Sequence, residues 1–85
     1  MVGYVYILRS KKDEHRYIGS TDDLVRRLRQ HSQGFVSSTK NRRPLILEGV
    51  LEFKTLVEAR IRERQFKKSR GALERAIQNN IRDIV

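Results

Sequence analysis

The sequence contains no cysteine and no tryptophan, one proline, and few acidic residues for its content of basic ones. The absence of cysteine excludes disulfides, thiolate metal sites and cysteine nucleophiles, and it fits a reducing compartment. Long hydrophobic runs are also missing: the longest, Tyr4 to Leu8, has five residues, whereas about 20 are needed to cross a bilayer. We therefore expect a soluble, cytoplasmic protein that does not enter the membrane.

The shortage of acidic residues leaves a strongly basic chain. Ten Asp and Glu stand against nineteen Lys and Arg in 85 residues, so the formal net charge is +9. The basic residues concentrate in two segments, 26–43 and 60–70. A positive field of this size attracts polyanions at long range. It predicts nucleic acid as the partner, the alternative being a charge excess that only aids solubility.

The length allows one small domain, and we expect residues 1–85 to form it. Residues 4–8 and 16–19 are rich in β-branched and aromatic side chains and predict two strands joined by a hairpin loop. Residues 45–54 alternate apolar and charged side chains and predict a third strand. With three helices, this order indicates an α/β fold of the α+β sandwich type: a small, three-stranded, mainly antiparallel sheet flanked by helices.

The helix boundaries follow from capping patterns. Ser20 with an acid three residues later resembles a capping box, which places Asp22 and Asp23 in the first turn of a helix ending near Gly34. Thr55 caps a second helix that runs to about Lys68. Gly71 then breaks the chain before a third helix, whose apolar face is Leu73, Ala76, Ile77 and Ile81.

Two polar residues share the apolar arc of the first helix. On a helical wheel, Arg27 and His31 fall with Leu24 and Leu28, whereas Arg26 lies outside that arc. Periodicity alone favours a structural explanation, in which the arginine stem lies along the core edge and the histidine is a hydrogen-bonded core residue.

A carboxylate occupies the same kind of position on the second helix. Glu63 lies within the arc marked by Ala59 and Phe66, and burying an unpaired carboxylate costs several kcal/mol. It must therefore meet a cation, which is a metal ion, Arg27 or Lys67. Lys67 is four residues further on, so spacing alone favours the salt bridge over the metal.

All three tyrosines lie on the two strands of the predicted hairpin. Tyr4 and Tyr6 share one face of the first strand, and Tyr17 belongs to the second. Aromatic packing across the strands is the structural explanation.

Taken in order, four groups of residues resemble the GIY-YIG nuclease family over nearly the whole chain. They are Tyr4-Val5-Tyr6-Ile7-Leu8, Tyr17-Ile18-Gly19-Ser20-Thr21, Arg27 with His31, and Arg62-Glu63 with Lys67. The chain is most similar to the small bacterial single-domain members. These typically also have His31-Ser32-Gln33-Gly34, Ser38-Thr39-Lys40 with Arg43-Pro44, and Arg62-Glu63-Arg64-Gln65.

The resemblance implies a role for each matching residue. Tyr6 is the tyrosine of the first motif, with Tyr4 and Val5 where the family name has glycine and isoleucine, and the second motif is intact in Tyr17 and Gly19. The implied catalytic residues are Tyr6, Tyr17, Arg27 on the scissile phosphate, His31, and Glu63 as the carboxylate that binds one metal ion. Which of Tyr6, Tyr17 or His31 acts as the general base stays open.

The implied activity is that of a metal-dependent endonuclease, which hydrolyses phosphodiester bonds of duplex or branched DNA with one Mg²⁺ or Mn²⁺. We expect the phosphates to be contacted by Arg26, Arg27, Lys40, Arg42, Arg43 and Lys67. The alternative is a basic nucleic-acid-binding module of the same fold that does not cut.

Overall fold

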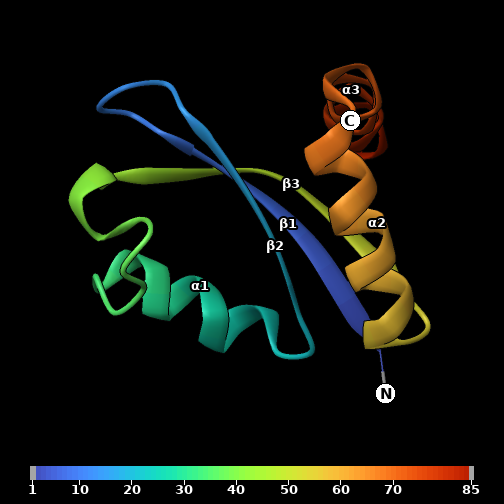
Figure 1. The fold of residues 1–85 in the computed structure, drawn as a ribbon, viewed down its shortest axis with the longest axis horizontal. Coiled ribbons are helices and arrows are strands. Elements are labelled where there is room, and N and C mark those ends of the chain that lie inside the picture. The colour runs from blue at the N-terminus through green and yellow to red at the C-terminus, as the bar shows by residue number, and fades with distance from the viewer. Residues whose placement is uncertain (1, 85) are drawn as a thin grey trace.

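The computed structural model describes residues 2–84, with side chains described for residues 2–78. The elements are β1 (Gly3–Ser10), β2 (Arg16–Thr21), α1 (Leu24–Ser32), the 3-10 turn η1 (Lys40–Arg42), β3 (Leu45–Phe53), α2 (Leu56–Lys68) and α3 (Arg70–Ile84). They form a three-stranded antiparallel sheet flanked by helices, which confirms the predicted fold class (Figure 1).

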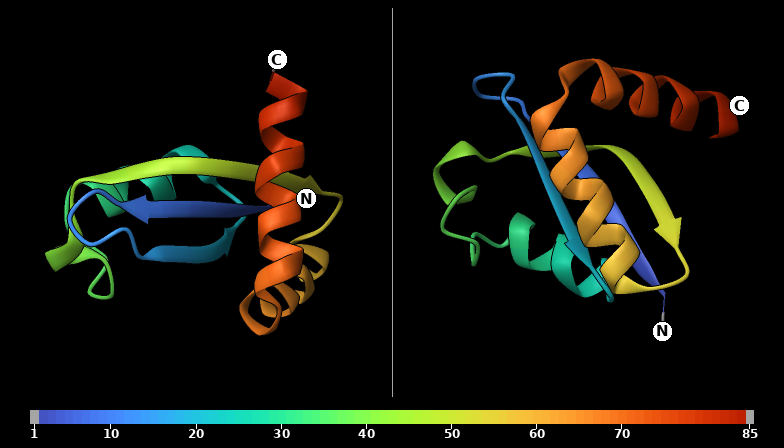
Figure 2. Two further views of the ribbon diagram at one scale, coloured as in Figure 1. Left: turned by 90° about the horizontal axis from the view of Figure 1, so that it is seen from above. Right: turned by 45° about the vertical axis from the view of Figure 1, so that its right-hand side comes forward.

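β1 is the central strand of the sheet, and β2 and β3 are its two edges. In the β1–β2 pair Tyr6 lies opposite Gly19, and Ile7 lies opposite Ile18. Because successive side chains on a strand point to opposite faces, Tyr6 and Gly19 share one face while Ile7 and Ile18 share the other. Helix α1 covers the first of these faces, and α2 crosses the second (Figures 1 and 2).

The central strand is buried on both faces. Val5 and Ile7 are fully buried in the main core, where they pack with residues of α2 and α3 that include Ala59 and Phe66. Tyr6 and Leu8 point the other way and are also buried. This two-sided burial explains why β1 is a continuous apolar run, whereas a strand with one wet face would alternate.

The third strand departs from the predicted regular alternation. Between Ile7 and Leu8 of β1, the partner on β3 jumps from Gly49 to Leu47, so Glu48 is the extra residue of a β-bulge. A bulge reverses which face the following side chains point to, because the side-chain period is two. The apolar residues before it, Leu45 and Leu47, lie on the α1 face, and those after it, Leu51 and Phe53, pack against the main core.

The start of α1 corrects one predicted cap. Ser20 and Thr21 belong to β2, and the N-cap is Asp23, whose Oδ1 accepts a hydrogen bond from the Arg26 amide at 3.1 Å. Asp22 and Asp23 therefore precede the helix and do not form its first turn. Pairing of β2 with β1 extends to Thr21, and this pairing excludes Ser20 from a cap.

The other helix ends agree with the prediction more closely, apart from the break before α3. Thr55 caps α2 by accepting a hydrogen bond from the Glu58 amide at 3.1 Å, and α1 ends at Ser32.

The break between α2 and α3 lies at Ser69, whose backbone is extended and whose Oγ accepts a hydrogen bond from the Ala72 amide at 3.2 Å. Gly71 is inside α3, so its predicted role as the helix breaker is wrong. Of the predicted α3 face, Leu73, Ala76 and Ile77 are buried, and Ile81 lies outside the residues whose side chains are described.

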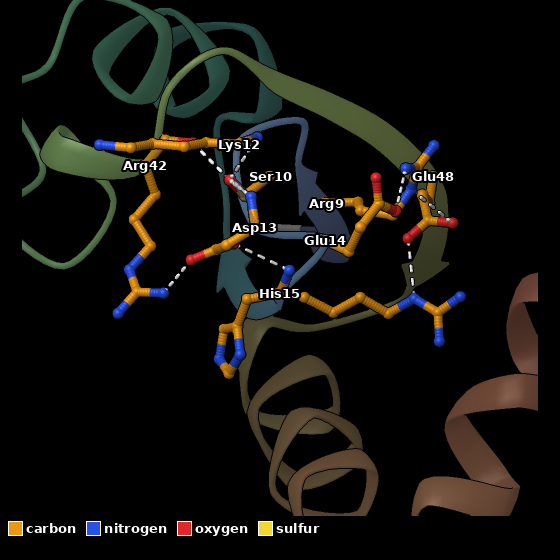
Figure 3. A network of polar contacts seen from close by, with 9 residues as sticks. Arg9, Ser10, Lys12, Asp13, Glu14, His15, Arg42 and Glu48 are labelled. Carbon is orange, nitrogen blue, oxygen red and sulfur yellow. Dashed lines mark hydrogen bonds and ion pairs between the residues drawn. The ribbon is translucent and has the colours of Figure 1, made fainter.

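The segment between α1 and β3 is tied to the β1–β2 hairpin loop. Ser10 Oγ donates to the Arg42 carbonyl at 2.7 Å, and the Lys11 amide donates to the Pro44 carbonyl at 2.9 Å. Arg42 and Asp13 also form an ion pair between the two segments (Figure 3). These contacts hold residues 35–44 against one end of the sheet.

No helix within residues 2–84 is both long enough and apolar enough to cross a membrane.

Candidate active site

The five residues predicted to be catalytic line one cavity of about 240 Å³. They come from both strands of the hairpin and from two helices: Tyr6 on β1, Tyr17 on β2, Arg27 and His31 on α1, and Glu63 on α2. Lys67 of α2 lines the cavity as well. Residues far apart in the sequence thus converge at the edge of the sheet formed by β2.

Gly19 permits this convergence because it has no side chain. The Tyr6 ring crosses directly over Gly19, so a Cβ atom there would lie 2.3 Å from Tyr6 Oη and 2.4 Å from Tyr6 Cζ. Real Cβ contacts are not this short, and both atoms belong to a buried phenol side chain that α1 and the sheet hold in place. The glycine of the second motif is therefore needed for the position of the tyrosine of the first.

Two polar side chains contact the Tyr6 hydroxyl. Tyr6 Oη lies 2.9 Å from His31 Nε2, and Arg27 Nε donates to the same oxygen at 3.3 Å. The rings of Tyr6 and His31 meet edge to face, with their centroids 5.4 Å apart. Arg27 also donates from Nη1 to Gln30 Oε1 at 3.1 Å. The polar residues on the apolar arc of α1 are therefore directed at the phenol of the central strand.

His31 lies in an environment that favours its neutral form. Its side chain is buried, with 5% of the residue exposed. Burial lowers the pKa of the imidazole, and the positive charge of Arg27 lowers that pKa further. The ring is therefore neutral near pH 7 and can accept a proton.

Glu63 approaches the cavity from the opposite face of the sheet. Its Oε1 accepts a hydrogen bond from Ser20 Oγ at 2.5 Å, and its Oε2 lies 2.6 Å from Lys67 Nζ. The Glu63 side chain is 19% exposed, and the cation that it contacts is Lys67, as the spacing predicts. The site therefore straddles β2, with the phenol, imidazole and guanidinium on one face and the carboxylate on the other.

Tyr17 borders the cavity from β2 and is half-buried. Its ring packs edge-on against the His15 ring, with their centroids 4.9 Å apart. Tyr17 thus lines the cavity from β2, whereas Tyr6 contacts both His31 and Arg27.

The six residues predicted to contact phosphates are not all equally available. Arg27 and Lys67 line the cavity, and Arg26 is exposed on α1 with Asp23 3.8 Å away. Lys40 is exposed at the start of η1, and Arg42 is paired with Asp13.

Arg43 is exposed and also contacts its own loop. It donates to the carbonyls of Lys40 and Ser32, at 3.0 and 3.4 Å, and its guanidinium lies over Gly34. Gly34 has a positive φ of 82°, which favours glycine at this position. The Arg43 side chain thus links residues 32, 34 and 40 of its own loop.

Two residues that contact the site had no catalytic or binding role assigned from the sequence. Ser20 was predicted to be a helix cap, but it hydrogen-bonds Glu63; its place next to Gly19 in a strand puts it on the opposite face, toward α2. Thr39 is fully buried and contacts His31, although it lies in a loop rich in polar residues where no periodicity marks it.

The carboxylate of Glu63 stands apart from other metal-binding side chains. Among the described residues, no group of three or more His, Cys, Asp or Glu side chains is placed to hold a metal ion. Among these described residues, a metal ion bound at Glu63 would thus have one carboxylate ligand from the protein.

Residues 2–78 match the family described as the GIY-YIG catalytic domain. The chain belongs to the GIY-YIG family. GIY-YIG domains are nuclease domains, and this membership agrees with the predicted resemblance. The structure is similar to the solution NMR structure of the UPF0213 protein BH0048 from Bacillus halodurans, with a TM-score of 0.58. The two chains are 35% identical, and the match covers 92% of this chain and 84% of that chain. A comparison with curated proteins finds no match.

Proposed function

We propose that this GIY-YIG chain is a metal-dependent DNA endonuclease that hydrolyses phosphodiester bonds with one divalent ion, Mg²⁺ or Mn²⁺. The observation that carries the proposal is the cavity at β2, in which a phenol, an imidazole, a guanidinium and one carboxylate converge. Phosphodiester hydrolysis needs an activated water, neutralisation of charge on the phosphate and help for the leaving oxygen. The convergent groups supply one candidate for each need.

Glu63 fits the metal that the family uses. Mg²⁺ keeps several waters and binds through one or two carboxylates plus substrate phosphates, so a lone carboxylate beside a cavity suffices. Lys67 now contacts this carboxylate, but its side chain is 56% exposed and long enough to move away. When bound, the ion would supply Lewis-acid neutralisation of charge on the phosphate and the leaving oxygen.

Arg27 is the residue best placed to hold the phosphate. Its guanidinium has five N–H donors, and the hydrogen bonds to Tyr6 and Gln30 use two of them. Arg27 borders the cavity, where the planar fork of its remaining donors suits non-bridging phosphate oxygens. The same two bonds keep the guanidinium in position before the substrate binds.

Tyr6 together with His31 is the pair that the geometry favours as the general base. A free phenol has a pKa of about 10, so it does not deprotonate water unaided near neutral pH. At 2.9 Å from a neutral imidazole, Tyr6 can pass its own proton to His31 Nε2 while it takes a proton from the attacking water. Tyr17, at the side of the cavity, is left to orient the water or the substrate.

One observation favours the second candidate, a nucleic-acid-binding module that does not cut. Both Glu63 oxygens already have partners, the Ser20 hydroxyl and the Lys67 ammonium. If Glu63 and Lys67 served only as an ion pair of α2, the basic surface would bind DNA without a catalytic ion.

The pair of variants Glu63→Gln and Lys67→Met separates the two candidates. Under the nuclease proposal, Glu63→Gln abolishes plasmid nicking with Mg²⁺ or Mn²⁺ and removes Mn²⁺ binding measured by calorimetry, while DNA affinity holds or rises. Lys67→Met keeps the carboxylate and removes its competing cation, so Mn²⁺ binding holds or tightens and DNA affinity falls.

The ion-pair reading predicts a different pattern. An exposed helical pair contributes only about 0.3–0.5 kcal/mol, so both variants would lose the same small amount of stability in a thermal melt. A Glu63→Gln variant that cuts at the wild-type rate would refute Glu63 as the metal ligand. A wild-type protein that binds DNA but does not nick it would support the binding module.

A further inference from the structure

Thr39 lies on the far side of His31 from the reacting groups. It is fully buried, and it belongs to the turn before η1. Its Oγ1 is 2.8 Å from His31 Nδ1 and 3.5 Å from the Val36 carbonyl oxygen. A polar side chain with no access to water needs hydrogen-bond partners, and these two contacts provide them.

The turn itself is held by backbone hydrogen bonds. The amides of Thr39 and Lys40 both donate to the Val36 carbonyl, at 3.1 and 2.9 Å, and the Arg42 amide donates to the Thr39 carbonyl at 3.0 Å. Because Arg42 is bonded in turn to the β1–β2 hairpin loop, the position of Thr39 is set from both sides. The hydroxyl is therefore fixed against His31.

Thr39 ends a chain of hydrogen bonds that begins at Arg27 and passes through Tyr6 and His31. An arginine side chain can only donate and the Val36 carbonyl can only accept, so the two ends are compatible with a chain in which every hydrogen bond points from Arg27 toward Val36. In the arrangement that gives every hydrogen an acceptor, Tyr6 donates to His31 Nε2, His31 Nδ1–H donates to Thr39, and Thr39 donates to Val36.

We propose that Thr39 is a positioning residue, which keeps the single proton of neutral His31 on Nδ1 and leaves Nε2 free to accept the Tyr6 proton. In a neutral imidazole, the hydrogen bond made by one nitrogen decides which nitrogen carries the proton. The effect on rate rests on the proposed nuclease function, whereas the assignment of the tautomer does not.

The proton balance of the step is complete. Water gives one proton to Tyr6 Oη as Tyr6 gives its proton to His31 Nε2, and the resulting hydroxide forms a bond to phosphorus as the bond to the leaving oxygen breaks. The imidazolium keeps its Nδ1–H on Thr39 and afterwards returns the Nε2 proton to Tyr6, which releases its own to solvent. The leaving oxygen takes a proton from solvent.

The test reads the tautomer directly. The chain has two histidines, so in a His15→Gln background the long-range ¹H–¹⁵N correlation spectrum of ¹⁵N-labelled protein reports His31 alone. Above pH 7.5 we expect a protonated Nδ1 and an unprotonated Nε2. Thr39→Val keeps the shape of the side chain without its hydroxyl and should shift His31 toward the Nε2–H form. Thr39→Ser, which keeps the hydroxyl, should restore the wild-type spectrum.

Nicking rates give the second readout, in the wild-type background. General acid–base catalysis contributes roughly 100- to 10,000-fold, so Thr39→Val should slow nicking by at least about tenfold. Thr39→Ser should stay within a few-fold of the wild type, and Ser37→Ala, an exposed position of the same turn, should be unchanged. Thermal melts establish that each variant is folded.

The outcomes are distinct. A wild-type spectrum with the proton on Nε2 overturns the proposal even if Thr39→Val does not fold, and so does a folded Thr39→Val variant with the wild-type tautomer and rate. If the tautomer is as expected but the wild-type protein does not nick DNA, the proposed function fails and the role of Thr39 in holding the tautomer stands.

Discussion

Arg26 and Arg27 are adjacent on α1 and carry the same charge, yet they have different surroundings. Arg27 contacts Tyr6 and borders the cavity, whereas the side chain of Arg26 is 67% exposed and lies near Asp23. The two arginines have the same charge, and it is their position on α1 that makes Arg27 a residue of the site and Arg26 a residue of the general basic surface.

Replacing each arginine by alanine tests this difference. Arg27→Ala should lower the nicking rate by at least about 100-fold, the cost of removing one donor to a transition-state oxyanion. Arg26→Ala should weaken DNA binding modestly and leave the rate at saturating DNA unchanged. Rates on plasmid DNA, with thermal melts to establish folding, give the comparison. Equal losses of rate in the two folded variants would contradict the placement of Arg27 in the site.

At the residue scale, helical periodicity predicted which polar side chains of α1 and α2 share the apolar arcs, and the resemblance to the GIY-YIG family implied their roles. The wheel placed Arg27 and His31 on the inner arc of α1 because that arc also holds the apolar residues. Thr39 could not be predicted in this way, because a loop has no period and the burial of its hydroxyl depends on tertiary contacts. The partner of Glu63 was predicted from spacing, but the contribution of Ser20 requires the knowledge that β2 continues past Gly19.

At the scale of elements, the strand β2 separates the Tyr6, His31 and Arg27 side chains of the site from the Glu63 carboxylate. The Tyr6 ring lies against one side of this strand at Gly19, and the next residue, Ser20, points to Glu63 on the other side. At Gly19 no side chain adds to the thickness of β2. The separation between the Tyr6 hydroxyl and the Glu63 carboxylate is thus set by the thickness of the β2 backbone.

The variant Gly19→Ala tests the close approach of the Tyr6 ring to β2, and Gly71→Ala is its control. A Cβ at Gly19 would overlap the Tyr6 ring, and overpacking costs about 1–3 kcal/mol, which corresponds to a fall in melting temperature of roughly 4 °C or more for a domain of this size. Nicking should fall by at least about tenfold because Tyr6 must move.

Among the residues whose side chains are described, a Cβ at Gly71 would meet only Arg75 Nη1, at 3.5 Å. Because Gly71 lies inside α3, alanine there should keep or raise the melting temperature. If Gly19→Ala melts and cuts like the wild type, the close approach of Tyr6 does not constrain the strand.

The number and type of the elements were predictable, and their junctions were less so. The apolar run of β1 and the capping Thr55 carry their signals locally. The bulge at Glu48 has no such signal, because one extra residue in a strand changes only which face the later residues occupy. The cap of α1 was misplaced since Ser20 and Asp23 are both good caps, and strand pairing decided between them.

At the scale of the whole molecule, the charge of +9 predicts how DNA binding depends on salt. Each phosphate contact on duplex DNA contributes about 0.9 to the slope of log K against log salt. We expect a slope of magnitude at least about 2, measured by fluorescence anisotropy on a labelled duplex between low and moderate KCl. The double variant Arg26→Ala with Lys40→Ala removes two exposed cations and should lower the slope by up to about 1.8. A slope near zero would contradict binding through phosphates.

The outermost position of β2 in the sheet also bears on how the site could be inhibited. An edge strand presents backbone N–H and C=O groups to which an extended peptide can add. Because residues from both faces of β2 line the cavity, a short peptide paired along this edge would lie beside the cavity. Such an inhibitor would rely on main-chain hydrogen bonds and would need no negative charge, in contrast to a phosphate mimic.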